Sequence, residues 1–298
     1  RQAQTDWARK PAIERAGHLR RIAAKLRENV AHLARTITLE QGKVSALAEV
    51  EVNFTADYLD YMAEWARRIE GEIITSDRPN ENIFLFRKPL GVVAGILPWN
   101  FPFFLIARKL APALLTGNTI VIKPSEETPN NCFEFAKLVA ATDLPAGVFN
   151  VVCGDGQVGG ALTAHKGVDM ISFTGSVATG SRIMAAAAPN ITKLNLELGG
   201  KAPVIIFDDA DIDAAVDGIR TFGFYNAGQD CCAATRLYVH EGIYDQFVEK
   251  LTEAVNTLRM GLQDDEGVEL GPLITAHHRE HVKGFVERAE AQPHIRIT

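Results

Sequence analysis

The sequence predicts an α/β fold with a parallel sheet, arranged as two packed units, and three observations lead to this prediction. Short apolar runs alternate with amphipathic helical patterns, which is typical of βαβ units. Prolines and an asparagine interrupt the longest apolar stretch, so no run approaches the roughly 18 residues that span a bilayer. The chain also has 298 residues, whereas one domain usually has about 100 to 200.

The N-terminal segment up to position 70 is expected to be helical. Apolar side chains recur at intervals of three and four from position 19 to 33, and again from 54 to 65, as they do on one face of a helix. Gly42 and Gly71 are natural stops for these helices. From 70 to 88 the residues become β-like around a polar insert, which predicts a projecting hairpin of the kind that often joins subunits.

After Pro89 the pattern changes to strands separated by helices. Strand-like runs occupy 92–97, 119–122, 149–152 and 170–173. A second series follows Glu197, with a strand at 204–207, a helix opening at 211–218 and a strand at 236–239. No linker or internal repeat marks a boundary. The motifs described below place it near Leu198, which gives domains 1–197 and 198–298.

Charge and cysteine usage exclude several classes of protein. The net charge is -6 and the basic residues are dispersed, which argues against nucleic-acid binding. The first residues lack the order of a signal peptide and an initiator Met, so the chain looks truncated there. The four cysteines have the spacing of neither a disulfide framework nor a zinc site. We expect no nucleic-acid or membrane partner, no metal, and a reducing, cytoplasmic setting.

The stretch from Asn226 to Cys231 is the most informative one. A cysteine after the flexible Gly228 and before two small residues can present its sulfur at a loop-to-helix junction, where helix amides favour thiolate. Free cysteine, with a pKa of about 8.5, is mostly protonated at neutral pH, so amides or a nearby base must help. A lone cysteine is more often structural. Cys232 could form a strained disulfide with Cys231, but a reactive thiol beside a packed one is favoured.

Two further polar side chains stand at predicted strand ends. Glu197 lies among apolar neighbours before two glycines, and burial there would raise its pKa toward the range of a general base. A boundary carboxylate paired with Lys201 is the simpler interpretation of the same pattern. Asn100, clamped between Pro98 and Pro102, can point its amide into a cleft and stabilise an oxyanion, or can make only a local turn bond.

Candidate ligand-binding residues lie at the carboxyl edge of the predicted sheet, where α/β folds bind their ligands. Lys123 and Glu126 follow the second predicted strand. Two glycine-bearing loops could hold a phosphate. One is a GxGxxG match that contains Gly156 and Gly159, and the other offers the Ser176 hydroxyl and the first amides of a helix. The Ser176 loop is preferred, since a lone GxGxxG match is weak.

Together, and in this order, these stretches resemble the aldehyde dehydrogenase superfamily over essentially the whole chain. The resemblance implies an aldehyde dehydrogenase-like fold: a Rossmann-type NAD-binding domain at 1–197, a partial α/β catalytic domain at 198–298, and a hairpin arm that joins a homodimer or homotetramer. It assigns Cys231 as nucleophile, Glu197 as general base and Asn100 as oxyanion donor. It implies a cofactor, NAD rather than NADP, bound by Ile96, Trp99, Lys123, Glu126, Gly156, Gly159, Ser176 and Leu198.

Within the superfamily, the stretch from Trp99 to Lys109 looks closest to bacterial lactaldehyde and glycolaldehyde dehydrogenases. Arg108 implies a polar or acidic tail on a small aldehyde substrate, because members that act on plain aliphatic aldehydes tend to carry an aromatic residue there. Phe104 is the second expected substrate contact. An arginine paired on a helix face is the alternative. The implied reaction is NAD-dependent oxidation of lactaldehyde, glycolaldehyde or a semialdehyde to the acid, through a cysteine thiohemiacetal and a thioester.

Two other functions remain open at this point. A CoA-acylating aldehyde dehydrogenase would pass the acyl group to a thiol, although such enzymes usually lack the base that Glu197 supplies. A non-catalytic nucleotide-binding fragment is the second alternative. It is considered because the chain stops at Thr298 without the family's C-terminal segment, so we expect truncation at this end as well.

Overall fold

The computed structural model describes residues 1–297. Thr298, the last residue of the predicted second domain, lies outside the described residues. The chain forms two compact units, Arg1–Thr36 with Glu49–Leu198, and Ile37–Ala48 with Gly199–Thr298. The sequence interpretation placed 37–48 in the first domain, whereas the structure groups it with the second unit. Packing explains the difference, because a Cβ at Gly42 would lie 2.8 Å from Cγ of Pro272.

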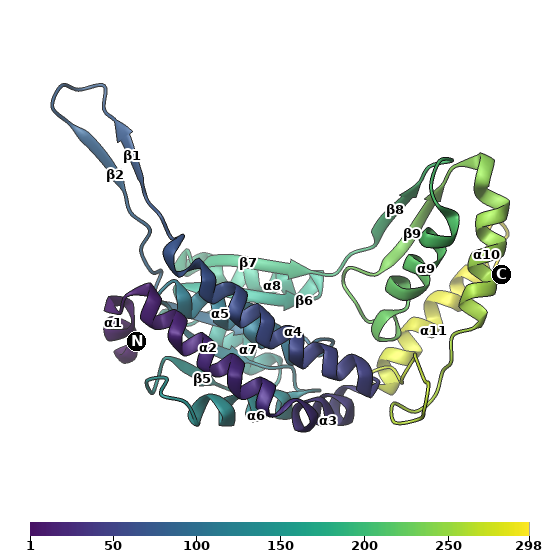
Figure 1. Cartoon of the computed structure of the whole chain (residues 1–298), viewed down its shortest axis with the longest axis horizontal. Helices are drawn as coiled ribbons and strands as arrows, with labels where there is room; N and C mark the ends of the chain where they lie inside the picture. Colours follow the sequence, from purple (N-terminus) through teal and green to yellow (C-terminus); the bar gives the residue numbers. More distant parts are fainter. Residues whose placement is uncertain (298) are drawn as a thin grey trace. The chain divides into compact units, whose positions relative to one another are not determined.

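A group of helices begins the chain, and helices and strands then alternate to the end of the first unit (Figure 1). In order, the elements are α1 (Gln2–Arg9), α2 (Ala12–Glu28), α3 (Val30–Gln41), α4 (Ser45–Glu64), η1 (Trp65–Arg67), β1 (Glu72–Thr75), β2 (Asn82–Leu85), β3 (Val92–Ile96), α5 (Phe104–Leu115), β4 (Thr119–Lys123), α6 (Pro129–Ala140), β5 (Phe149–Val151), α7 (Gly156–Thr163), β6 (Met170–Gly175), α8 (Val177–Ala187), η2 (Ala188–Asn190) and β7 (Lys193–Leu198). The predicted helices and the four predicted strands are therefore confirmed.

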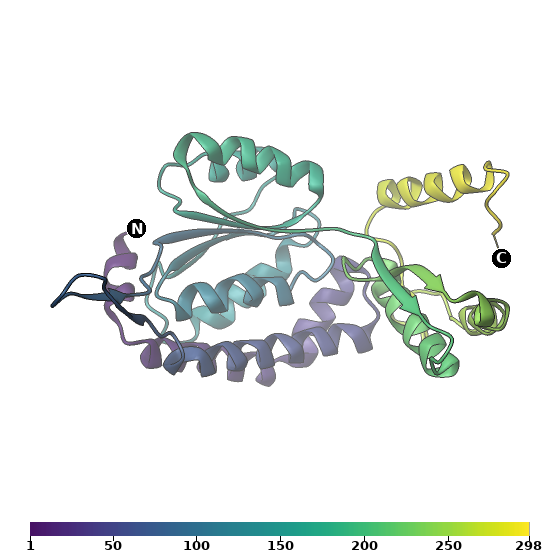
Figure 2. The same cartoon turned by 90° about the horizontal axis from the view of Figure 1, so that it is seen from above.

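Five parallel strands form the central sheet of the first unit, in the order β5-β4-β3-β6-β7. Figure 2 shows helices on both faces of this sheet. On one face α8 packs on β6 and β7, and on the other α5 packs on β3 and β4, with α2 outside it. Every residue of β3 is buried, as expected for a strand covered on both faces. The carboxyl ends of all five strands therefore meet at one edge.

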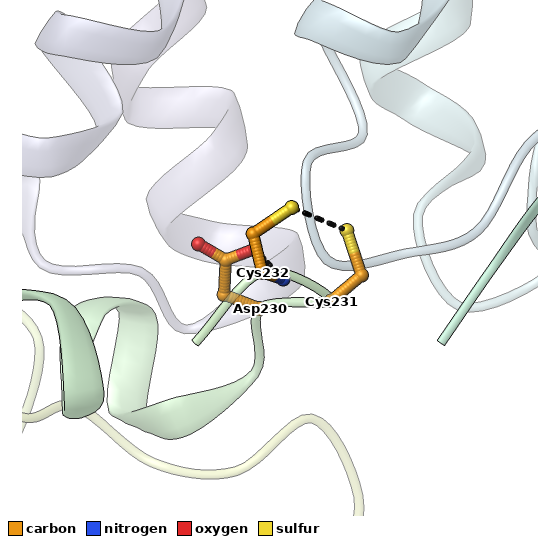
Figure 3. A group of neighbouring side chains, drawn as sticks. All are labelled: Asp230, Cys231 and Cys232. Atoms are coloured by element: carbon orange, nitrogen blue, oxygen red, sulfur yellow. Dashed lines mark hydrogen bonds between the residues drawn. The ribbon is translucent and has the colours of Figure 1, made fainter. Parts of the chain in front are cut away.

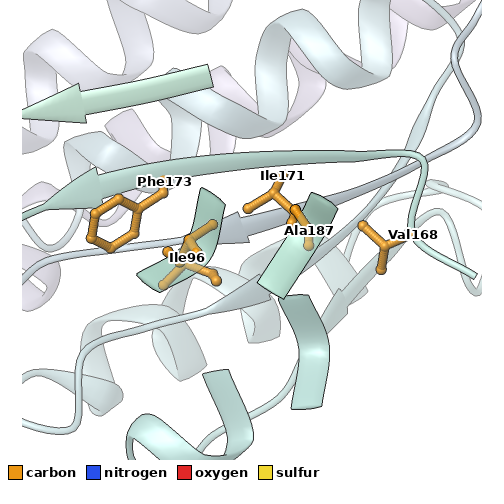
Figure 4. Close-up of a cluster of buried hydrophobic side chains, with 7 residues drawn as sticks. Ile96, Val168, Ile171, Phe173 and Ala187 are labelled. Carbon is orange, nitrogen blue, oxygen red and sulfur yellow. The ribbon is translucent and has the colours of Figure 1, made fainter. Parts of the chain in front are cut away.

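Apolar residues on one face of β3 and β6 hold α8 against the sheet. Ile96, Ile171 and Phe173 pack with Ile183 and Ala187 of α8 in one buried cluster (Figure 4). Burial of an isoleucine or phenylalanine side chain contributes about 1.5–3 kcal/mol. The alternation of side chains along a strand leaves the intervening residues of β3 and β6 on the opposite face.

Gly95, in β3, makes room for a lysine on that opposite face. A Cβ at Gly95 would lie 2.4 Å from Cδ1 of Ile122 and 3.3 Å from Cδ of Lys109. The aliphatic part of Lys109 therefore lies close over the sheet. Its ammonium group reaches the hydroxyls of Ser172 and Thr174 on β6.

The predicted hairpin is present as the antiparallel pair of β1 and β2, with Glu72 opposite Leu85 and Thr75 opposite Asn82. Every residue of both strands is exposed, and Figure 1 shows the pair extending away from the sheet of the first unit. An isolated two-stranded hairpin is marginally stable in water. The hairpin therefore adds little to the core of the first unit.

The helix stops follow the sequence signals closely. Helix α3 ends at Gln41, and Gly42 adopts φ 78°, the left-handed conformation in which glycine commonly ends helices. The predicted run from 19 to 33 divides at Asn29 into α2 and α3. Among the helices that residues 1–297 form, none is long and apolar enough to cross a membrane.

The second unit contains a smaller α/β arrangement. Its elements after β7 are β8 (Ala202–Ile206), α9 (Ile212–Gly223), η3 (Tyr225–Gly228), β9 (Ala234–Val239), η4 (Glu241–Ile243), α10 (Tyr244–Asn256) and α11 (Ala276–Glu290). Strands β8 and β9 pair in parallel, and Ile206, Val216, Ile219 and Phe247 form the buried core beneath α9 and α10. The α/β character predicted for this region is confirmed.

Candidate active site

A cavity of about 520 Å³ lies in the first unit at the carboxyl edge of the parallel sheet. Its walls come from the ends of β3, β4 and β6 and from α7 and α8. Because parallel strands end at one edge, residues far apart in the sequence converge there. Seven of the eight predicted cofactor residues line it, namely Ile96, Trp99, Lys123, Glu126, Gly156, Gly159 and Ser176.

Lys123 and Glu126 form an ion pair on the wall of this cavity. Nζ of Lys123 lies 3.4 Å from Oε2 of Glu126 and donates a hydrogen bond to the carbonyl oxygen of Pro124 at 3.0 Å. The Lys123 side chain is 5% exposed, whereas that of Glu126 is 57% exposed. The ammonium group is thus fixed in the protein, and the carboxylate borders both cavity and solvent.

The starts of two helices border the same cavity. Oγ of Ser176 caps α8 by accepting a hydrogen bond from the Thr179 amide at 3.2 Å. Asp155 caps α7 in the same way through the Gln157 amide. A Cβ at Gly156 would meet no heavy atom within 4 Å, so the backbone there is open to a ligand. The two glycine-bearing loops that the sequence presented as competitors therefore line one site.

Leu198 and Asn100 are not among the residues that line this cavity. Leu198 packs against the buried cluster beneath α8, and its Cδ2 lies 3.0 Å from the position a Cβ would take at Gly180. Asn100 is half-buried in a bend after β3. Their predicted contacts with cofactor and substrate stay predictions.

Glu197 lies on β7, the outermost strand of the sheet. Leu194, Leu196 and Leu198 of this strand pack toward the cluster beneath α8, whereas Glu197 is exposed. The predicted burial of Glu197 among apolar neighbours is therefore wrong, because its side chain points to the face of β7 opposite the one on which α8 packs. In the strand register Glu197 lies opposite Thr174 of β6.

The sequence analysis missed Lys109 as a functional candidate. This residue is 4% exposed, and its ammonium group donates to Oγ of Ser172 at 3.2 Å and to Oγ1 of Thr174 at 2.7 Å. Burial lowers the pKa of Lys109 to about 8, while the Glu197 carboxylate acts in the opposite direction. The available signal was a lysine inside the apolar helix FLIARKLAPALL, since lysines are almost never fully buried without partners.

Arg108 and Phe104 lie one turn apart on α5, beside aromatic residues of α4. The Phe104 ring centroid lies 4.7 Å from that of Phe54 and 5.5 Å from that of Tyr58. The Arg108 guanidinium carbon lies 5.8 Å from the Tyr58 ring centroid. Burial raises the pKa of Tyr58, and the Arg108 charge opposes this shift. The spacing of Phe54 and Tyr58 at i and i+4 was the sequence signal that they share a helix face.

Cys231 lies in a turn of the second unit between η3 and β9, next to Cys232 (Figure 3). The predicted loop-to-helix junction is wrong, because the chain enters strand β9 at Ala234, which pairs with Ala202 of β8. The first amides of a helix have no backbone partner and could stabilise a thiolate, whereas the amides of a paired strand are used in hydrogen bonds to the neighbouring strand. Both thiols are exposed.

The backbone before Cys231 is held in a rare conformation. Asn226 and Ala227 adopt left-handed conformations with φ 52° and φ 56°. Asparagine tolerates this conformation, whereas it costs about 1–2 kcal/mol for alanine. Buried amides stabilise this turn. Nε2 of Gln41 donates to Oδ1 of Asn226 at 3.2 Å, and Nε2 of Gln229 donates to the Asn226 carbonyl oxygen at 3.1 Å.

The environment of Cys231 opposes ionisation of its thiol. Cys231 is exposed overall, but partial desolvation of its thiol raises the pKa of Cys231 to about 12, and the neighbouring Cys232 thiol and Asp230 carboxylate act in the same direction. The sulfurs of Cys231 and Cys232 lie 3.6 Å apart. In this arrangement the thiol is protonated at neutral pH, so nucleophilic attack requires a base.

Comparison with known proteins identifies the relationship. The profile described as "Aldehyde dehydrogenase family" matches residues 1–295. The chain belongs to the aldehyde dehydrogenase family. Lactaldehyde dehydrogenase of Escherichia coli (strain K12) is 58% identical over 289 residues, which cover 96% of this chain and 60% of that protein. The same strain's succinate-semialdehyde dehydrogenase (NADP(+)) is 44% identical over 287 residues, which cover 95% and 60%.

A solved structure supports the same relationship. The crystal structure of lactaldehyde dehydrogenase from Escherichia coli gives a TM-score of 0.95 at 58% identity, covering 97% of this chain and 61% of that one. This aldehyde dehydrogenase chain therefore has the family's fold along nearly its whole length. It spans about 60% of the length of the relatives that it matches. The predicted fold class and the family resemblance are confirmed.

Proposed function

We propose that this chain carries the cofactor site and the nucleophile for NAD-dependent oxidation of a small polar aldehyde to its carboxylic acid. The aldehyde is lactaldehyde, glycolaldehyde or a semialdehyde. The observation that carries the proposal is the cavity of about 520 Å³ at the sheet edge, which is lined by seven of the residues that the sequence predicts to bind the cofactor. Pockets for small molecules and cofactors commonly have about 300–1,000 Å³.

The residues around this cavity fit a dinucleotide. Ser176 and the first amides of α8 would hold the pyrophosphate, because the N-terminus of a helix favours negative charge. Lys123 and Glu126 would bind the adenosine ribose. The exposed Glu126 carboxylate accepts hydrogen bonds from ribose hydroxyls and repels a 2′-phosphate, which favours NAD over NADP. The names of two relatives contain NADP(+), so the preference is worth measuring directly.

The proposed chemistry follows from the residue types. Cys231 attacks the aldehyde carbon, and Asn100 donates a hydrogen bond to the oxyanion that forms. Bound NAD would supply the hydride acceptor for the oxidation at that carbon. The resulting thioester on Cys231 is hydrolysed by a water molecule from which Glu197 removes a proton. Because the pKa of the Cys231 thiol is raised to about 12, its proton must also pass to a base during attack.

Arg108 and Phe104 would contact the substrate. The structure gives Arg108 no ion-pair partner among residues 1–297, and its guanidinium group lies beside the Tyr58 ring. A hydroxyl or carboxylate on the aldehyde can accept hydrogen bonds from this group. Two relatives are named for lactaldehyde and succinate semialdehyde, both of which carry such a group.

The hairpin of β1 and β2 would join subunits of a homodimer or homotetramer. Its apolar side chains are open to solvent, with Ile73 of β1 76% exposed and Phe84 of β2 54% exposed. Exposed apolar surface of this kind is typical of protein–protein contact sites. We therefore propose that a second copy of the chain covers it.

The decisive experiment is a measurement of NADH formation with glycolaldehyde, lactaldehyde, succinate semialdehyde and propanal. It should use this chain and a version extended at its C-terminus to the length of the relatives. We expect NADH from the three polar aldehydes and little from propanal. Arg108→Leu should lower the preference for polar substrates about tenfold, since a lost polar contact costs about 1–3 kcal/mol. Arg182→Leu, which alters the cofactor cavity, is the matched control and should leave the aldehyde ranking unchanged.

Other outcomes would point to the alternatives. NAD binding without NADH formation in either version would favour the non-catalytic interpretation. Formation of acyl-CoA in place of free acid, after addition of CoA, would favour the acylating one. Equal rates with propanal and lactaldehyde would contradict the role of Arg108.

A further inference from the structure

The thiols of Cys231 and Cys232 lie closer together than adjacent side chains usually do. In a strand, neighbouring side chains point to opposite faces. Here both residues occupy the turn that precedes β9, and Figure 3 shows the two sulfurs directed toward each other. The Sγ–Sγ distance is 3.6 Å, and both residues are exposed. The expectation of one reactive thiol beside one packed thiol is therefore wrong for Cys232, because the turn exposes both residues as a dithiol.

The carboxylate of Asp230 completes this group. One of its oxygens and the two sulfurs all lie within 4.8 Å of one another. Oδ1 of Asp230 accepts a hydrogen bond from the Cys232 amide at 3.0 Å, so the backbone of the turn orients the carboxylate toward the thiols. Two sulfurs and one oxygen are a ligand set that zinc accepts in proteins.

The spacing of the sulfurs distinguishes chelation from a disulfide. In a tetrahedral site with metal–sulfur bonds of about 2.3 Å, two sulfur ligands lie roughly 3.8 Å apart. The observed 3.6 Å is close to that value. A disulfide would require the sulfurs of Cys231 and Cys232 to approach to about 2.05 Å, with a matching distortion of the peptide between them. The turn therefore suits a shared cation better than a sulfur–sulfur bond.

We propose that Asp230, Cys231 and Cys232 form a chelating site for a thiophilic divalent cation such as Zn²⁺ or Cd²⁺, with water as the fourth ligand. Binding replaces the proton of each thiol with a metal–sulfur bond and releases two protons, and no electrons are transferred. The bound cation is coordinated by the sulfur of Cys231, which is then not available for nucleophilic attack. If Cys231 is the nucleophile, as the proposed function holds, the bound cation blocks the reaction reversibly.

Cadmium alone is the probe for the site, because thiolate–cadmium bonds absorb in the ultraviolet. The reduced chain is titrated with Cd²⁺, and competition with a chelator gives the affinity. We expect one tightly bound Cd²⁺ per chain. Cys232→Ser should weaken binding at least about 100-fold and Asp230→Asn about 10-fold, since the loss of a ligand costs more than the loss of a charge. Cys153→Ser removes an exposed thiol outside the group and should change nothing.

The results separate the site from the proposed function. Equal Cd²⁺ affinity in the parent chain and Cys232→Ser, or loss of binding in Cys153→Ser, would overturn the site. Circular dichroism of each variant shows whether the fold is retained, and Cys232→Ala provides a second replacement if Cys232→Ser unfolds. In a version that turns over, Zn²⁺ should inhibit, a chelator should restore the rate, and Cys232→Ser should resist inhibition relative to its own rate. Cadmium binding without inhibition by Zn²⁺ would support the site and contradict the nucleophile assignment.

Discussion

The cavity at the sheet edge and the turn that carries Cys231 are built by different means. The cavity is a product of topology, because five parallel strands end at one edge and deliver their following loops there. The turn depends on side-chain detail, since the left-handed Asn226 and Ala227 are held by the buried amides of Gln41 and Gln229. A binding site made by topology tolerates many sequences, whereas a turn made by a few hydrogen bonds depends on each of them.

The largest expected effect separates the two regions directly. Cys231→Ala in a version that turns over should lower kcat by at least about 10⁴-fold, because removal of a nucleophile abolishes the covalent route. NAD affinity should change by less than about twofold, since the cavity lies in the other unit. Steady-state kinetics and calorimetric titration of NAD measure the two quantities. Cys132→Ala, which removes a buried thiol away from the turn, is the control; normal turnover in Cys231→Ala would refute the mechanism.

The next largest effect concerns the buried ammonium group of Lys109 and the pH dependence of stability. Lys109 has a pKa of about 8 in the folded chain, against an ordinary value of 10.5. Between these values the unfolded chain binds more protons than the folded one, so the free energy of unfolding should rise with pH by about 3 kcal/mol. Urea unfolding from pH 8 to 10.5 measures this rise. The rise should be absent in Lys109→Met and unchanged in Lys166→Met, which replaces an exposed lysine. The same rise with pH in the parent chain and in both variants would contradict the lowered pKa of Lys109.

A smaller effect concerns cofactor choice at the cavity. Glu126→Ser should weaken NAD binding about tenfold and strengthen NADP binding, because it removes the carboxylate acceptor of the ribose hydroxyls and its repulsion of a 2′-phosphate. Titration with both dinucleotides measures the change. Glu127→Ser is the matched control, since Glu127 is adjacent and exposed but does not line the cavity. An unchanged ratio of affinities in Glu126→Ser would mean that another residue sets the preference.

The smallest expected effect concerns the backbone strain in the turn before Cys231. Ala227→Gly should raise the free energy of unfolding of the second unit by about 0.5–1 kcal/mol, because glycine adopts φ 56° without the penalty of a Cβ. Ala214→Gly, in the helix α9, should lower it by about 0.5–1 kcal/mol. Denaturant unfolding compares the two substitutions. Equal destabilisation by both would show that the turn is unstrained.

Most of the fold could be predicted from the sequence, because the spacing of apolar residues indicates the helices and strands and their alternation indicates a parallel sheet. The strands at 92–97, 119–122 and 170–173 are short runs of mainly apolar residues, and the parallel sheet follows from the helices between them. The grouping of 37–48 with the second unit was out of reach. It depends on the contact of Gly42 with Pro272, which are 230 positions apart in the sequence (272 − 42).

The site was predictable only in part, and for a related reason. Lys123, Glu126 and Ser176 converge because each lies at or just after the carboxyl end of a parallel strand. The exposure of Glu197 depends on which face of β7 is covered by α8, and the thiol geometry at Cys231 depends on a turn of unusual dihedral angles. Neither feature has a local sequence signature, because the covering of a strand face and left-handed alanines are decided by tertiary packing.

Gly95 links two positions that no motif connects. A methyl group at 95 would meet Ile122 and the stem of Lys109, so the lysine crosses the sheet only where β3 has no side chain. Among descendants of this sequence, we expect alanine at 95 to appear only together with shorter residues at 109 and 122. Each single step toward that combination passes through an overpacked or under-filled core, which costs about 1–3 kcal/mol. Successive single substitutions would therefore seldom produce that combination. Gly95 and Lys109 should be retained or replaced together.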